Sequence, residues 1–141
     1  MQSPAFVITS CARLLERRLG DQLPLSQYRI LAMLGDGPER AGRVSRLLEL
    51  SKPAVTDAVD GLVERGLAVR RLDESDRRAV AVTITDTGCD VLAAIEERLA
   101  TALDEIIEHC DDPHRARVAL DDLAGAVDRF VRQRRAARGR R

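Results

Sequence analysis

Aromatic side chains, cysteine and lysine are all scarce in this sequence. Phe, Trp and Tyr make up 2% of the 141 residues, with one Tyr, two Phe and no Trp, so recognition of a ligand by aromatic stacking is limited. The three cysteines are an odd number without close pairing, which favours the cytoplasm over an oxidising compartment. A chain of this length buries roughly two thirds of its unfolded surface without a disulfide or a metal, and we expect no cofactor.

Long hydrophobic runs are also missing. No apolar stretch approaches the roughly 18 residues of a membrane span, and residues 1–13 lack the basic start and apolar stretch of a signal peptide. The composition, 45% hydrophobic and 33% charged, is typical of a globular protein. We therefore expect one domain, residues 1–141, located in the cytoplasm and without a membrane partner.

The charges cancel, but they are unevenly distributed. Basic and acidic residues number 23 each, and only one of the basic residues is Lys. Seven Arg and no acid lie from Arg129 to the C-terminus, which leaves a net charge of minus seven on the other 128 residues. Nucleic-acid binders are often basic, so the neutral total argues weakly against that class.

Apolar residues at helical spacing predict four helices in the first half of the chain. Ser3 followed by Pro4 starts the first helix, Ser26 is the expected N-cap of the second, and Ser51 starts the fourth. Glycines end three of them, since Gly is the usual C-terminal stop. The predicted helices cover residues 3–20, 26–35, 41–48 and 51–65.

After Gly66 the apolar period changes from 3.6 to 2. Residues 67–72 and 80–84 alternate as strands do, and the charged connector 73–78 separates them, which predicts a β-hairpin. Thr85 can cap a long helix over residues 86–110, and Asp111-Asp112-Pro113 starts a last helix, expected to fray after Phe130.

The predicted order is typical of a mostly α (α+β) winged helix-turn-helix protein. Helices 41–48 and 51–65 are separated only by Glu49-Leu50, and the hairpin follows as a wing. We expect a DNA-binding lobe over residues 23–86. Residues 1–22 and 87–137 carry apolar stripes without a partner in that lobe, so we expect them to form a homodimerisation region.

The sequence resembles the MarR family (multiple antibiotic resistance regulators). Five stretches carry the resemblance in family order, residues 25–31, 51–56, 59–67, 73–80 and 84–88. The resemblance implies a homodimer that binds a pseudo-palindromic operator in double-stranded DNA. It also implies a repressor that a small molecule or an oxidant releases.

Helix 51–65 has a polar face suited to a recognition helix. Short polar side chains allow close approach to base edges, and Lys52 lies at the helix N-terminus, where backbone N–H groups favour phosphate. Asp57 stands where many relatives carry Arg or Asn. It either accepts a hydrogen bond from cytosine or pairs with an Arg, and we favour the pairing.

In the wing, the resemblance implies that an Asp braces the hairpin and an Arg enters the minor groove. These roles fall on Asp76 and on Arg77 or Arg78, without distinguishing the two arginines; the alternative is a tip that mixed charge merely keeps hydrated. The predicted DNA-binding residues are Ser51, Lys52, Pro53, Thr56, Asp57, Arg70, Asp76, Arg77 and Arg78.

The first two helices hold the candidates for an effector pocket. The family binds small aromatic or amphipathic ligands near this place, and here Val7, Cys11, Leu14, Tyr28 and Arg29 can line it or can equally be plain core. Cys11 also suggests a redox-switched repressor. The peroxide-sensing branch, however, places its Cys further ahead and surrounds it with Tyr, so we expect Cys11, Cys89 and Cys110 to be buried structural residues.

Two further alternatives concern metal binding and function class. His109, Cys110, Asp111, Asp112 and His114 resemble a ligand cluster but lack zinc spacing, so a cap at the helix junction is the better interpretation. No catalytic set of residues is evident, and we do not expect an enzyme. Residues 23–86 hold ten basic and ten acidic residues, which leaves open a winged helix that binds protein and not DNA.

Overall fold

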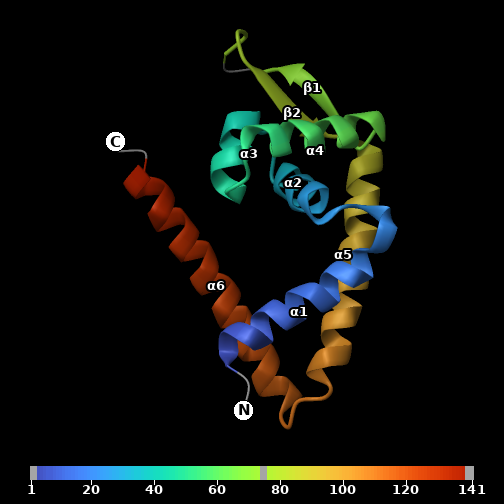
Figure 1. Ribbon diagram of the computed structural model, residues 1–141, viewed down its shortest axis with the longest axis vertical. Helices are drawn as coiled ribbons and strands as arrows, with labels where there is room; N and C mark the ends of the chain where they lie inside the picture. The colour runs from blue at the N-terminus through green and yellow to red at the C-terminus, as the bar shows by residue number, and fades with distance from the viewer. Residues whose placement is uncertain (1–2, 74–75, 139–141) are drawn as a thin grey trace. The chain divides into compact units, whose positions relative to one another are not determined.

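The computed structural model describes residues 3–73 and 76–138 (Figure 1). The chain forms two compact units, Met1–Ala100 and Thr101–Arg141. The predicted fold class, mostly helical with a two-stranded wing, is confirmed. In chain order the elements are α1 (Pro4–Leu19), the 3-10 helix η1 (Gly20–Gln22), α2 (Leu25–Gly35), α3 (Ala41–Leu48), α4 (Lys52–Glu64), β1 (Ala68–Leu72), β2 (Val80–Ile84), α5 (Asp86–Ile107) and α6 (Pro113–Arg138).

Two of the predicted serine caps are confirmed, and one is wrong. The hydroxyl of Ser3 accepts a hydrogen bond from the Phe6 amide at 3.2 Å, and that of Ser51 from the Ala54 amide at 3.3 Å. Ser26 instead lies inside the first turn of α2, which starts at Leu25 because Pro24 occupies the N-cap position. A proline there leads directly into the helix, so α2 needs no serine cap.

A tight turn joins α3 to α4. Glu49 adopts the left-handed conformation with φ of 54°, and the Leu50 amide donates to the Ser45 carbonyl at 3.1 Å. The Ser45 hydroxyl donates back to the Leu50 carbonyl at 2.7 Å. The amide and the carbonyl of Leu50 are therefore both tied to Ser45 of α3, which restrains the direction in which α4 starts.

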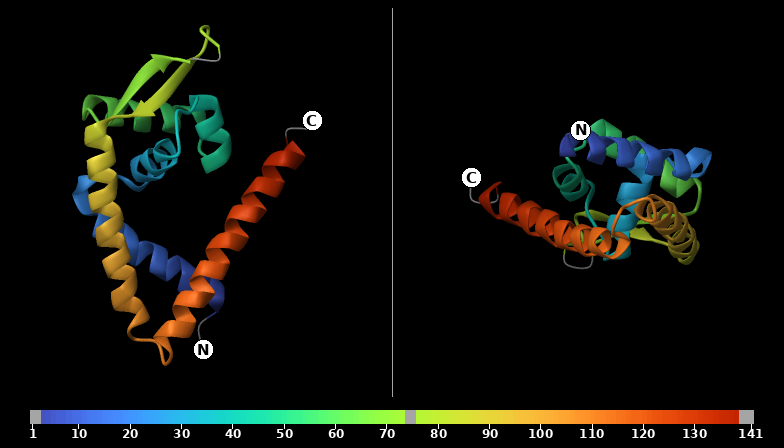
Figure 2. Two further views of the ribbon diagram at one scale, coloured as in Figure 1. Left: turned by 180° about the vertical axis from the view of Figure 1, so that it is seen from behind. Right: turned by 90° about the horizontal axis from the view of Figure 1, so that it is seen from below.

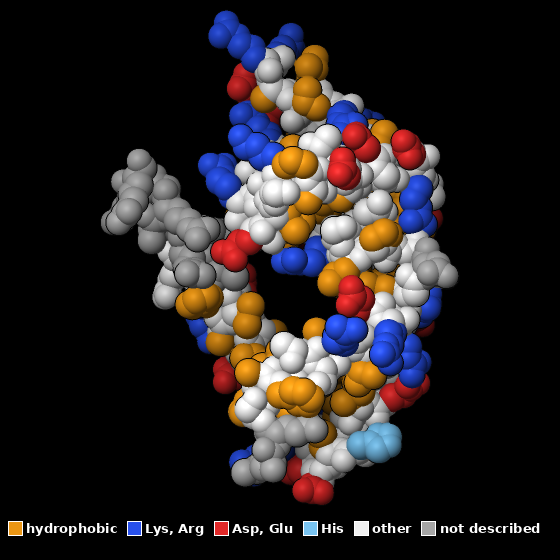
Figure 3. Space-filling model, viewed as in Figure 1, with side chains coloured by type: hydrophobic (Ala, Val, Ile, Leu, Met, Phe, Trp, Pro, Cys, Tyr) orange, Lys and Arg blue, Asp and Glu red, His pale blue; other side chains and the backbone are white. Residues whose placement is uncertain are grey.

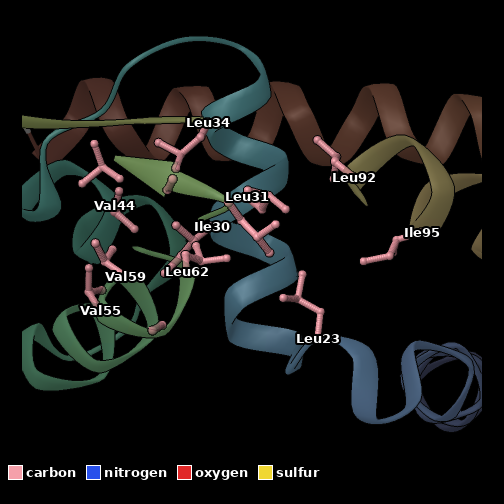
Figure 4. Close-up of a cluster of buried hydrophobic side chains, with 14 of the residues drawn as sticks. Leu23, Ile30, Leu31, Leu34, Val44, Val55, Val59, Leu62, Leu92 and Ile95 are labelled. Carbon is pink, nitrogen blue, oxygen red and sulfur yellow. The ribbon is translucent and has the colours of Figure 1, made fainter. Parts of the chain in front are cut away.

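The core of the first unit lies between α2, α3, α4 and α5, as Figure 4 shows. Because α4 buries one face against α2 and α3, its opposite face is left exposed. The core side chains labelled in the figure are Leu23, Ile30, Leu31, Leu34, Val44, Val55, Val59, Leu62, Leu92 and Ile95.

The wing is an antiparallel hairpin with an extra backbone contact. The register runs from Ala68 opposite Ile84 to Leu72 opposite Val80. Glu39 adds an isolated bridge on β2: its amide donates to the Val82 carbonyl at 3.0 Å and its carbonyl accepts from the Val82 amide at 2.8 Å. The sequence pattern did not indicate this bridge.

The predicted alternation of buried and exposed residues along the hairpin is not observed. Leu72 and Val80 are 65% and 51% exposed, whereas Ala81 and Val82 are consecutive and both buried. Leu72 and Val80 lie at the end of the strands next to the hairpin tip. Elsewhere β1 packs on α4 and β2 packs on α2. Burial in this wing therefore depends on distance from the helices more than on strand face.

Thr85 joins the wing to α5. Its hydroxyl donates to the Gly66 carbonyl at 2.7 Å and accepts from the Gly88 amide at 3.0 Å. Its own amide donates to the Leu67 carbonyl at 3.1 Å. The predicted cap is confirmed, and it also fastens the end of α4 to the start of α5.

Arg98 docks the end of α1 and η1 against α5, beside which they lie in Figure 2. Its guanidinium donates to the Arg18 carbonyl at 2.8 Å and to the side-chain oxygen of Gln22. These contacts, together with the burial of Leu19 and Leu23, attach α1 to the rest of the first unit.

In the second unit, a capped turn leads into α6. The Asp112 carboxylate accepts from the Arg115 amide at 2.9 Å, which confirms the predicted cap at the helix junction. Helix α5 ends at Ile107 and not at Cys110, because the amides of His109 and Cys110 turn back to the carbonyls three residues earlier. Arg117 pairs with Asp104 and, at 3.5 Å, with Glu108.

Two further observations concern the helices. Helix α6 continues to Arg138, so the prediction that it frays after Phe130 is wrong over residues 131–138; Arg and Ala are strong helix formers and sustain it. Residues 139–141 lie outside the described part of the chain. None of the described helices is both long and apolar enough to span a bilayer.

Replacing Gly88 tests the junction at Thr85. A Cβ at Gly88 would lie 2.1 Å from the Leu67 carbonyl oxygen, whereas a Cβ at Gly42 on α3 would meet nothing within 4 Å. We expect Gly88→Ala to lower the free energy of unfolding by about 1–3 kcal/mol, and Gly42→Ala to leave it unchanged or raise it by about 0.5–1 kcal/mol. Urea denaturation measures both; equal effects would contradict the packing at this junction.

Candidate nucleic-acid interface

The N-terminal half of α4 presents the predicted recognition surface. The buried side of α4 consists of Val55, Ala58, Val59 and Leu62. The predicted contact residues of this helix, Ser51, Lys52, Pro53, Thr56 and Asp57, are all exposed. The Thr56 hydroxyl donates to the Lys52 carbonyl at 3.0 Å, which fixes its rotamer and leaves its oxygen able to accept from a ligand.

The expected pairing of Asp57 with an Arg is not observed. Asp57 forms no ion pair with any residue in 3–73 or 76–138, whereas Asp60 pairs with Arg70 at 2.6 Å between Oδ1 and Nη2. Asp60 lies one turn further along α4, and Arg70 is on β1. The pairing therefore falls on Asp60, and the carboxylate of Asp57 faces solvent.

Arg70 links the wing to α4 through this ion pair, and its predicted contact with DNA stays a prediction. Both partners are partly exposed, at 41% for Arg70 and 48% for Asp60. An exposed ion pair contributes little to the free energy of unfolding. It nevertheless restrains the angle between the recognition helix and the hairpin, because one partner belongs to each element.

Asp76 braces the hairpin tip, in agreement with the predicted role. One carboxylate oxygen of Asp76 accepts from the Arg78 amide at 3.1 Å, and the Asp76 carbonyl accepts from the Ala79 amide at 2.8 Å. Asp73 accepts from the Asp76 amide at 3.3 Å. The two aspartates thus order the backbone from which Arg77 and Arg78 project.

Arg40 is a part of this site that the sequence analysis missed. Its Nε lies 2.6 Å from Asp73 Oδ2, and its Nη1 lies 3.6 Å from Asp76 Oδ2. The hydrogen bond to Asp73 is the main reason why the pKa of Arg40 is raised; the charges of Asp73 and Asp76 add to it, and partial desolvation opposes it. Since 33 residues separate Arg40 from Asp73, no local pattern could have revealed the contact.

Arg77 and Arg78 are exposed. Neither forms an ion pair with another residue of the described ranges, and Glu74 and Ser75 lie outside those ranges. In Figure 3, Lys and Arg side chains gather at the tip of the hairpin and along the side of the lobe next to α3. The wing therefore presents two guanidinium groups to solvent.

The five predicted effector-pocket residues fall into two groups. Tyr28 is half-buried against the core, and Arg29 donates from Nη2 to the Leu48 carbonyl at 3.4 Å, at the end of α3. On α1, Val7 and Leu14 are exposed and Cys11 is partly buried. The residues on α2 therefore contact the core and the end of α3, while Val7 and Leu14 on α1 are exposed apolar side chains.

None of the three cysteines is fully buried, contrary to the prediction. Cys89 and Cys110 are exposed, and only Cys11 is partly buried. Cys89 lies in the first turn of α5, and Cys110 lies in the turn after α5. Their positions relative to the core decide their exposure, whatever the general preference of cysteine for the interior.

A helix-turn-helix followed by a two-stranded wing, with a capped and exposed recognition helix, defines a winged helix-turn-helix protein. Residues 21–79 match the family model described as MarR family. Over 81 residues the chain is 31% identical to an uncharacterized HTH-type transcriptional regulator, YpoP, of Bacillus subtilis (strain 168). The matched part covers 57% of each protein.

Solved structures show the same fold. The transcriptional regulator BldR from Sulfolobus solfataricus matches with a TM-score of 0.69 and 26% identity, over 86% of this chain and 89% of that one. CouR from Rhodococcus jostii RHA1, bound to p-coumaroyl-CoA, matches with a TM-score of 0.72 and 22% identity, over 90% and 87%. Residues 21–79 therefore resemble the MarR family, and the fold of the chain is that of these solved structures.

Titration of Tyr28 tests its place in the core. Burial, and secondly the charge of Glu96, raise the pKa of Tyr28 above its usual value. Because the folded state holds this proton more tightly, the resulting stability is present below the ordinary pKa of about 10 and is lost as pH rises through the folded pKa. Tyr28 is the only tyrosine, so phenolate absorbance reports it alone.

We expect the absorbance midpoint to lie above that of the protein unfolded in urea. Glu96→Gln should lower the midpoint only partly, since burial is the larger cause, while Asp90→Asn on the same helix serves as the control. A folded-state midpoint equal to the unfolded one would show that Tyr28 is solvated.

Proposed function

We propose that this chain is a transcriptional repressor that binds double-stranded DNA as a homodimer, at a pseudo-palindromic operator, and that a small molecule releases it. The proposal rests on one observation: the same lobe carries an exposed polar helix N-terminus, at the start of α4, and a braced wing with two arginines. The match of residues 21–79 to the MarR family model supports it.

In the proposed complex, the start of α4 enters the major groove. Ser51, Thr56 and Asp57 face the base edges, and the carboxylate of Asp57 accepts a hydrogen bond from cytosine N4. Lys52 contacts phosphate at the helix N-terminus, where the backbone amides also favour an anion. The exposure of all four side chains supports this arrangement.

The wing supplies a second contact. Arg77 and Arg78 project from a tip whose backbone Asp73 and Asp76 hold in place. A narrow minor groove has an enhanced negative potential that attracts arginine. We place one of these arginines in the minor groove beside the bases that α4 reads.

The homodimer is supported by exposed apolar side chains at both ends of the chain. On α1 these are Phe6, Val7, Ile8 and Leu14, and on α6 they are Val118, Leu120, Leu123, Val127 and Phe130. A contiguous apolar surface on a helix is unfavourable in water and marks an interface. A symmetric dimer would cover these surfaces and set two recognition helices about one DNA turn apart.

The effector is proposed to be a small aromatic or amphipathic molecule. CouR, which shares the fold, was solved with p-coumaroyl-CoA bound. In this chain, Val7, Cys11, Leu14, Tyr28 and Arg29 are the proposed lining, with Arg29 as the cation for a ligand anion. A ligand releases DNA only if it binds the DNA-incompetent arrangement more tightly, and the Arg29 contact with the end of α3 would be the contact it alters.

Arginine variants of the wing test DNA binding. Gel shifts on the DNA that flanks the gene for this chain should give wild-type binding that weakens steeply with salt. We expect Arg77→Ala or Arg78→Ala to weaken it by ~1–3 kcal/mol, as expected for loss of a groove contact. Lys52→Ala should reduce the salt slope by about one, as loss of a phosphate contact does.

Arg13→Ala, on the exposed surface of α1, is the matched control and should bind like the wild type. If the wild type shows no salt-dependent binding to this fragment or to genomic DNA, the chain is not a DNA-binding regulator. A winged helix that binds protein would then be the better interpretation.

A charge on the apolar face of α6 tests the homodimer. Leu123 and Val127 are one helical turn apart on the same face, while Asp121 lies on the opposite face. Sedimentation should show a wild-type dimer at micromolar concentration, and Leu123→Glu should raise the dimer dissociation constant by at least about tenfold, since a charge is costly to bury. Asp121→Lys should leave the dimer intact; a stable wild-type monomer would contradict the assembly.

A further inference from the structure

We propose that Arg40 positions the wing for DNA contact: it ties the hairpin tip to the start of α3 and pairs with the carboxylates of Asp73 and Asp76. The inference rests on the proposed function, and it assigns a role to a residue outside both the recognition helix and the hairpin. Arg40 is a positioning residue in this account, since it acts through the wing and not by touching a base.

One guanidinium group reaches two carboxylates that lie three residues apart in the chain. Arg40 Nε is 2.6 Å from Asp73 Oδ2, and Arg40 Nη1 is 3.6 Å from Asp76 Oδ2. Asp73 follows the last residue of β1, and Asp76 braces the tip. A planar group with several fixed donors suits this contact, whereas the single ammonium of a lysine does not.

Glu39, the residue before Arg40, is attached to β2. Glu39 pairs with Val82 of β2 through two backbone hydrogen bonds of 3.0 and 2.8 Å. Consecutive residues just before α3 thus hold both strands of the wing, Glu39 by its backbone and Arg40 by its side chain. The direction in which the hairpin projects is therefore set by the helix-turn-helix itself.

Charge gives Arg40 a second effect. Asp73 and Asp76 lie in the same tip as Arg77 and Arg78, and without Arg40 their carboxylates can pair with these arginines. By occupying both acids, Arg40 leaves the two wing arginines available to DNA.

The contact is partly exposed, so its loss should not unfold the protein. The Arg40 side chain is 44% exposed and that of Asp73 is 17% exposed, and ion pairs at the protein surface contribute little to the free energy of unfolding. The strand register and the buried core do not depend on it. The cost of removing Arg40 should therefore appear in the hairpin tip and in DNA affinity.

Arg40→Ala and Arg43→Ala form a matched pair of variants. Arg43 lies on the first turn of α3 and pairs with Glu39 at 3.0 Å, so its removal deletes the same charge without touching the wing tip. The probe is a duplex that the wild-type chain selects from a random-sequence pool. We expect Arg40→Ala to bind it about tenfold more weakly and Arg43→Ala to bind within about twofold of the wild type.

A second readout needs no DNA. Hydrogen exchange of the Asp76 and Ala79 amides, which are bonded within the tip, should be faster in Arg40→Ala and unchanged in Arg43→Ala. If Arg40→Ala does not fold, Arg40→Lys keeps the charge but cannot span both acids, and it should show the same faster exchange and weaker binding.

A third comparison separates positioning from direct contact. In an Arg77→Ala, Arg78→Ala background, Arg40→Ala should cause no further loss, because Arg40 acts through these arginines. A full tenfold loss in that background would show that Arg40 touches DNA itself and would overturn the proposal. So would exchange and binding in Arg40→Ala equal to those of Arg43→Ala.

Failure of the proposed function is distinguishable from failure of this inference. If the wild-type chain selects no duplex from the pool, the regulator assignment fails, and with it the role of Arg40 in DNA binding. If the wild type selects a duplex and Arg40→Ala binds it normally, only the role of Arg40 fails.

Discussion

The hydrogen bonds of Thr85 hold the recognition helix, the wing and α5 in one arrangement. Its hydroxyl links the Gly66 carbonyl, at the end of α4, to the Gly88 amide, at the start of α5. The close approach of Gly88 to the Leu67 carbonyl leaves no room for a side chain. Every residue proposed to touch DNA belongs to an element that enters or leaves this junction, so their mutual placement depends on it.

Local patterns predicted most of the fold because its elements are defined by local interactions. The helix caps at Ser3, Ser51 and Thr85, the short turn at Glu49 and the hairpin all depend on residues within a few positions of each other. The N-cap predicted at Ser26 was wrong because Pro24, two residues earlier, occupies the N-cap position and α2 starts without a serine cap. The prediction that the cysteines are buried was wrong, because the general preference of cysteine for the interior does not say which positions of a helix or turn face the core.

The sequence predicted which residues belong to the candidate site, but it did not predict which of them form ion pairs. The exposed residues of α4 and the arginines of the tip follow from periodicity and from the family resemblance. The partners of Asp60, Asp73 and Asp76 do not, since each lies on another element and the pairs join positions 10 to 36 residues apart. Such pairs are exposed and leave no hydrophobic signal in the sequence, so only three-dimensional contacts identify them.

Lys52 is the first residue of α4 and the only lysine in the chain. Arginine supplies every other basic side chain, and guanidinium groups do not react with acylating reagents that modify amines at neutral pH. The ε-amino group of Lys52 is therefore the only side-chain amine in the sequence, and it lies at the start of the proposed recognition helix. Acetylation there would remove one positive charge at the position where α4 is proposed to meet phosphate.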